Sequence, residues 1–156
     1  MKKFAFYITN QGFGHASRNI PLIEGILERE PESIIYVKTD AVRCEFMRRN
    51  LKAYIGNICF CEEYQDIGLI LQKNSYEIDA QKLKKVVAEE QKRWHTYRQT
   101  EVQFLKTQKI DLVVSDIIPW ILLAAQECGV SSVLLCNFTW YEMYKDFLPE
   151  ELCLPY

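Results

Sequence analysis

The chain has 156 residues and a mass of 18.4 kDa, the size of one domain with its own hydrophobic core. Hydrophobic residues make up 49% of it and charged residues 26%, and these fractions exclude intrinsic disorder and a fibrous repeat. The net charge of −2 disfavours a nucleic-acid partner, and no run of about 20 apolar residues predicts a transmembrane segment.

The amino-terminal segment and the cysteines bear on the cellular compartment. Lys2 and Lys3 precede an apolar run, but the run stops after Ile8, too early for a signal peptide, and no small-residue cleavage site follows. The six cysteines are far fewer than a disulfide-stabilised scaffold needs. Cys59 and Cys61 lack the second pair or nearby histidines of a zinc site, so no metal is expected. We therefore expect a cytoplasmic protein with reduced thiols.

Apolar runs and helical periodicity alternate along the chain. In chain order they predict a strand at 4–9, a helix at 18–30, a strand at 33–37, a helix capped by Asp40 that ends at 49, a strand at 54–61, helical structure at 80–106, a strand at 110–115, a helix at 120–127 with a C-cap at Gly129, a strand at 132–136 and a helix at 141–147. The helical stripe at 80–106 is interrupted at 89–91, which leaves one kinked helix and two helices as alternatives. The segment 62–78 has no clear period and is predicted to be an exposed loop.

The alternation of strands and helices indicates the fold class. The predicted strands are apolar on both faces, which is typical of a parallel sheet that helices cover on both sides. We therefore predict an α/β fold: a Rossmann-like open, mostly parallel sheet of about five strands with helices on both faces. The whole chain, 1–156, is expected to form this single domain.

The loop after the first predicted strand is the first candidate site, because ligands bind at the carboxyl ends of such strands. Gly12 and Gly14 allow a sharp turn and a close approach to a ligand, and His15 could act as a general base. The start of the next helix and Arg18 suit an anion. Ser17 stands where the dinucleotide fingerprint requires glycine. The alternative is a tight turn with a capping histidine and a surface arginine.

Two further loops follow predicted strands. Asp116 could bind a ligand or orient His15 if the two loops are neighbours, although capping of the next helix would also explain it. Asn137, Thr139 and Trp140 could line a pocket for a sugar or ring, with packing of the aromatic side chains as the alternative.

These loops carry a resemblance to a known family. The stretches FYITNQGFGHASR (6–18), DLVVSDIIP (111–119) and CNFTW (136–140) resemble, in the same order, the N-terminal domain of GT-B-fold glycosyltransferases. They most resemble the glycosyltransferase-like N-terminal region of arabinokinases. The resemblance extends over nearly the whole chain and is more specific than the glycine-rich loop alone.

The resemblance implies a role in sugar transfer. In GT-B enzymes the N-terminal domain mainly receives the acceptor, and the C-terminal domain holds the nucleotide sugar, here expected to be UDP-linked. It implies His15 and Asp116 as catalytic residues and no bound metal or other cofactor in this chain. The expected ligand-binding residues are Gly12, Phe13, Gly14, Arg18, Asn137, Thr139 and Trp140.

The expected partners are a sugar or glycoconjugate acceptor and either a C-terminal domain or a second chain. Because no C-terminal nucleotide-sugar domain or kinase domain follows within these residues, we expect this chain alone to be inactive in transfer. Apolar surface left uncovered could also drive homodimerisation.

Two alternative functions remain open at this point. One is a non-catalytic module that binds a sugar or a nucleotide sugar. The other is a flavodoxin-like or other mononucleotide-binding domain.

Overall fold

The computed structural model describes all 156 residues, in which strands and helices alternate. The strands are β1 (Lys3–Ile8), β2 (Ile34–Thr39), β3 (Ile58–Glu62), β4 (Leu112–Asp116) and β5 (Ser131–Leu135). The helices are α1 (Gly14–Arg29), α2 (Ala41–Asn50), the 3₁₀ helix η1 (Lys52–Asn57), α3 (Ala80–Gln108), α4 (Pro119–Cys128), α5 (Trp140–Tyr144) and α6 (Glu150–Cys153). None of them has both the length and the apolar character that crossing a membrane requires.

The five strands form one parallel sheet in the order β3-β2-β1-β4-β5. The chain adds strands in one direction from β1 to β3 and then returns to place β4 on the other side of β1. The topological switch point, where ligands bind in such sheets, therefore lies between β1 and β4. This order confirms the predicted Rossmann-like fold and differs from the 2-1-3-4-5 order of flavodoxin-like domains.

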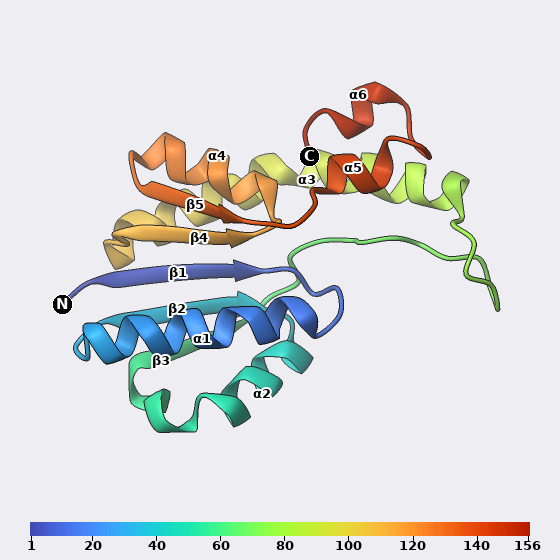
Figure 1. The fold of residues 1–156 in the computed structure, drawn as a ribbon. Coiled ribbons are helices and arrows are strands. Elements are labelled where there is room, and N and C mark those ends of the chain that lie inside the picture. The colour runs from blue at the N-terminus through green and yellow to red at the C-terminus, as the bar shows by residue number, and fades with distance from the viewer.

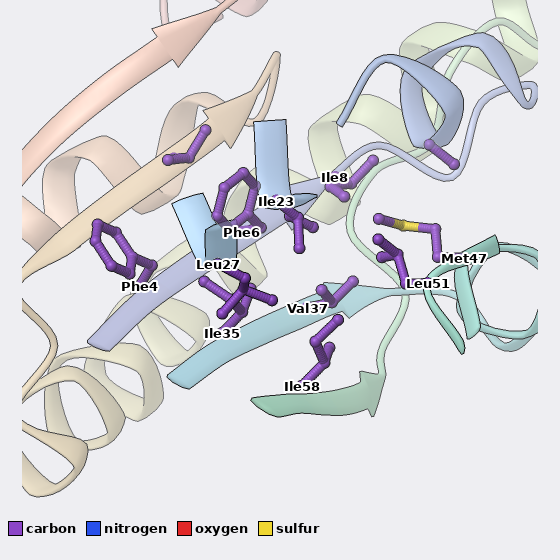
Figure 2. Close-up of a cluster of buried hydrophobic side chains, with 12 residues drawn as sticks. Phe4, Phe6, Ile8, Ile23, Leu27, Ile35, Val37, Met47, Leu51 and Ile58 are labelled. Atoms are coloured by element: carbon purple, nitrogen blue, oxygen red, sulfur yellow. The ribbon is translucent and has the colours of Figure 1, made fainter. Parts of the chain in front are cut away.

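Helices cover the sheet on two sides (Figure 1). Side chains of β1 alternate between these sides, because successive residues of a strand point in opposite directions. Phe4, Phe6 and Ile8 enter a core with α1 and α2, which Figure 2 shows around Ile23 and Leu27. The other side of β1 packs into a second core with residues of α3 and α4.

The prediction that helices cover both faces of every strand is wrong at β5. Val133 is 50% exposed and Leu134 is 42% exposed, because β5 lies at the edge of the sheet and has a neighbouring strand on one side only. Val133 and Leu135 line an open apolar cleft with Pro21 and Leu22 of α1.

Other boundaries differ from the predictions for local reasons. Residues 52–57 form η1, so the strand predicted at 54–61 starts only at Ile58. α3 is one continuous helix of 29 residues across the polar interruption, because Glu90 is buried within its packed face. α6 follows Pro149 and was not predicted. The caps predicted at Asp40 and Gly129 are present, the first through a bond from the Arg43 amide and the second through a left-handed φ of 68°.

The segment between β3 and α3 also differs from its prediction. It lacks regular strand or helix apart from a single bridge between Leu71 and Ile78, as expected for a loop. However, Gln65 and Asp66 within it are buried, with 2% and 5% of their surface exposed. The prediction of an exposed loop is therefore wrong for its first part, which bonds to Asn10 after β1 and to Trp120 of α4.

Candidate functional site

Three loop-bearing strand ends meet at the switch point. The sheet register pairs Asp116, the last residue of β4, with Ile8 at the end of β1 and with Leu135 at the end of β5. The loops that follow these strands therefore begin side by side. The expectation that Asp116 could orient His15 depended on the first and second loops being neighbours, and the structure provides this arrangement.

Asp116 is fully buried and lies at the centre of the cluster. Its carboxylate accepts hydrogen bonds from His15 Nδ1 at 2.7 Å, Arg18 Nε at 2.8 Å and Asn19 Nδ2 at 2.7 Å, and a further bond from Arg18 Nη2. Burial by itself would raise the pKa of this carboxyl, but the bonds from Arg18 and His15 outweigh burial and hold the pKa below its ordinary value. Asp116 is therefore an anion at neutral pH.

The hydrogen bond to Asp116 fixes the tautomer of His15. A carboxylate oxygen only accepts, so in the neutral imidazole the 2.7 Å contact places the proton on Nδ1 and leaves a lone pair on Nε2. No group of the chain bonds to Nε2, and the side chain is 13% exposed. The ring of Phe138 packs edge-on against the imidazole, with centroids 5.9 Å apart. This is the geometry of a general base with an orienting carboxylate.

Arg18 is engaged within the cluster. Besides its bonds to Asp116, its Nη1 donates to Asn137 Oδ1 at 3.0 Å and its Nη2 donates to the Leu135 carbonyl at 3.3 Å. Nη2 also lies 3.0 Å from His15 Nδ1, but that nitrogen has no free lone pair for it. The expected role in binding an anion stays a prediction, and in this conformation the guanidinium instead joins the second and third loops.

The two glycines of the first loop play different parts. Gly12 has a φ of +67°, a left-handed conformation that glycine adopts at little cost. Gly14 has no such φ and begins α1, and nothing lies within 4 Å of where a Cβ would be. Phe13 forms no side-chain cap on α1, so the first amides of the helix have no side-chain acceptor. An anion or a polar ligand group could bind there.

The remaining predicted ligand residues are dispersed. Thr139 caps α5 by accepting a hydrogen bond from the Glu142 amide. Trp140 is only 3% exposed, so its side chain packs beneath the loop, as the alternative interpretation expected. Phe13 does not face His15: it packs against Phe46, with centroids 5.2 Å apart, and lines an apolar cleft of about 500 Å³ beside α2.

Sequence reasoning missed two residues of the cluster. Asn19 is fully buried, bonds Asp116 and the His15 carbonyl, and leaves its own Oδ1 without a partner. A polar side chain within the buried stripe of α1 was the available signal. Ile117 has a φ of +57°, a strained conformation for a β-branched residue directly after Asp116. No sequence pattern indicates that strain.

The structure contains no cluster of three or more histidine, cysteine or acidic side chains that could hold a metal ion. All six cysteines are free. The switch point brings together the His15 imidazole, the Asp116 carboxylate and the start of α1.

Comparison with solved structures defines the class of fold. CalG4, the calicheamicin glycosyltransferase, matches with a TM-score of 0.57 at 19% identity, over 94% of this chain and 37% of its own. UGT89C1 of Arabidopsis thaliana in complex with UDP-L-rhamnose has a TM-score of 0.55 at 15% identity, over 97% of this chain and 40% of its own. MurG of Acinetobacter baumannii has a TM-score of 0.54 at 14% identity, over 86% of this chain and 35% of its own. The chain thus has the Rossmann-like fold found in GT-B glycosyltransferases.

A curated protein adds similarity in sequence. L-arabinokinase of Arabidopsis thaliana is 26% identical over an alignment that covers 93% of this chain and 14% of that protein. No protein-family profile matches the chain. The resemblance to GT-B glycosyltransferases and arabinokinases is confirmed, while the chain spans only a small part of the curated relative and less than half of each solved structure.

Proposed function

We propose that the chain is the acceptor-binding half of a glycosyltransferase, which transfers a sugar from a UDP-linked nucleotide sugar to an acceptor hydroxyl. The observation that carries the proposal is the pair of His15 and Asp116 at the switch point, with Nε2 of the imidazole free of any bond within the chain. The glycosyltransferase-like fold supports the reaction class, and the neighbour bound to UDP-L-rhamnose supports a UDP-linked donor.

The reaction uses the imidazole as a general base. Nε2 of His15 accepts the proton of the acceptor hydroxyl while the hydroxyl oxygen bonds to the anomeric carbon of the donor. The bond from that carbon to the nucleoside diphosphate breaks, and the diphosphate leaves with the electron pair. Asp116 keeps the imidazole in the required tautomer and stabilises the imidazolium that forms.

The donor would be bound by a C-terminal domain, either in the same polypeptide or in a second chain. Gly14 and the uncapped start of α1 offer this half a place for a polar group of either substrate. The engaged donors of Arg18 leave the cluster close to electrically neutral, which suits a neutral hydroxyl group as acceptor.

The test replaces the base in the assembled enzyme. His15→Ala should lower turnover about 100-fold or more with folding unchanged, because a positioned general base contributes roughly that factor. His95→Ala is the matched control, since His95 is the only other histidine and is exposed on α3. Turnover that survives in His15→Ala would remove His15 from the mechanism. Weaker sugar binding in that variant, with no transfer by the wild type, would establish a binding module instead.

A further inference from the structure

The first part of the segment between β3 and α3 is tied to the loop after β1. This segment leaves the carboxyl end of β3 and runs on that side of the sheet to the start of α3 (Figure 1). The Asn10 side chain fixes it: Oδ1 accepts from the Gln65 amide at 2.9 Å and the Asp66 amide at 3.0 Å, and Nδ2 donates to the Asp66 carbonyl at 2.9 Å. Two chain segments far apart in sequence are thus joined by three bonds.

The Asp66 carboxylate extends this connection to the loop after β5. Its Oδ2 accepts from Thr9 Oγ1 at 2.5 Å and from Trp140 Nε1 at 2.9 Å, and its Oδ1 lies 3.5 Å from Gln11 Nε2. Thr9 and Gln11 precede His15 in the first loop, while Trp140 follows Asn137 in the third. One carboxyl group therefore holds together the two loops that flank Asp116.

No cationic side chain bonds to this carboxylate, although it is only 5% exposed. Burial raises the pKa of the Asp66 carboxyl. The titratable groups near it, Tyr64, Glu90 and Tyr144, are all acidic, so none of them supplies a positive charge to balance it. An uncompensated buried carboxyl costs stability, so packing alone does not account for an acid at this place. Its three side-chain donors come from the loops of the candidate site.

We propose that Asp66 is a positioning residue that holds the loop carrying His15 in register with the loop after β5. It acts through Thr9, Gln11 and Trp140 and touches neither His15 nor Asp116. The position of the imidazole is then set from two directions, by Asp116 on the sheet and by Asp66 at the base of the loop. The contribution of Asp66 to catalysis rests on the proposed function, whereas its effect on His15 does not.

The experiment compares Asp66→Ala with the wild-type chain by NMR. Long-range ¹H–¹⁵N spectra of His15 report its hydrogen bond to Asp116, and His95 is an internal reference on α3. We expect the His15 nitrogen signals to shift in Asp66→Ala, and the Gln11 amide, which bonds Thr9 Oγ1, to exchange at least about tenfold faster. Asp66→Asn retains an acceptor oxygen and should restore most of both signals.

A matched control separates positioning from general destabilisation. Asp111→Ala removes a carboxylate that accepts from the Lys3 amide at 2.7 Å at the opposite end of the sheet, and it should leave the His15 signals unchanged. If Asp66→Ala does not fold, Thr9→Val removes one donor with little change of shape and should shift His15 in the same direction.

Unchanged His15 signals in both variants would overturn the proposal. A shift of His15 in a protein that proves to transfer no sugar would leave the positioning intact and refute only the proposed function.

Discussion

The bonds around Asp116 make a strong prediction about stability. Asp116→Asn removes the charge that pairs with Arg18 and turns one acceptor oxygen into a donor that faces other donors. Breaking a buried pair from one side costs about 3–5 kcal/mol. The Arg18 side chain is 27% exposed, so water recovers part of this cost, and we expect a loss of about 2–3 kcal/mol. At this chain length, that corresponds to a melting temperature lower by roughly 4–12 °C.

Urea denaturation at pH 7, followed by tryptophan fluorescence, measures the change. A double-mutant cycle with Arg18→Met isolates the pair, because the double variant leaves no unpaired charge. We expect a coupling energy of at least about 1 kcal/mol. The difference between wild type and Asp116→Asn should also shrink in acid. The lowered pKa of Asp116 means that its contribution is complete above its ordinary value of 3.8 and is lost as the pH falls through the lower folded-state value.

Two results would refute this reasoning. One is an Asp116→Asn variant within about 0.5 kcal/mol of the wild type at pH 7, which is the range of an ordinary surface substitution. The other is strict additivity of the two substitutions, which would mean that Arg18 and Asp116 do not interact in solution.

Three other substitutions test the surroundings of the site by the same denaturation assay. Gly68→Ala should cost about 1–2 kcal/mol from its φ of +70° alone, and its Cβ would also displace the Gln11 side chain, 2.2 Å away; equal stability would show that the loop adjusts freely. Lys38→Met should cost about 3–5 kcal/mol because it strands the buried Glu101 carboxylate, which Lys38 contacts at 2.8 Å, and neutralising Glu101 as well should recover part of the loss. Gly12→Ala should lower the free energy of unfolding by about 1–2 kcal/mol, because Gly12 has a left-handed φ. Gly14→Ala should change it by less than about 0.5 kcal/mol but weaken ligand binding measured by calorimetry. Equal losses of stability in the two variants would contradict their assigned roles.

Local patterns in the sequence identified most of the fold. Runs of apolar residues located all five strands, because the strands of a parallel sheet are rich in apolar residues. Caps such as Asp40 and Gly129 identified helix ends, because they act within one turn of the chain. The start of α1 was predicted four residues late. Its first turn has neither a side-chain cap nor the apolar periodicity that marks the rest of the helix.

The candidate site was predicted in part. Glycine, histidine and aspartate at strand ends pointed to His15 and Asp116, but whether these residues meet depends on strand order, which no local pattern encodes. Only the tertiary structure brings β4 beside β1 and Asp116 against four donors. It also decides that Arg18 is engaged internally rather than free, and that Phe13 turns toward α2.

The sequence by itself therefore determined which segments become strands and helices and which residue types stand at the strand ends, because propensity, periodicity and capping act over a few residues. The tertiary structure alone decided how the loops combine. The burial of Asp66 and the pairing of His15 with Asp116 arise from contacts between residues that lie 57, 74 and 101 positions apart in the chain. Such contacts come from the packing of the sheet as a whole, so they cannot be read from any single stretch of residues.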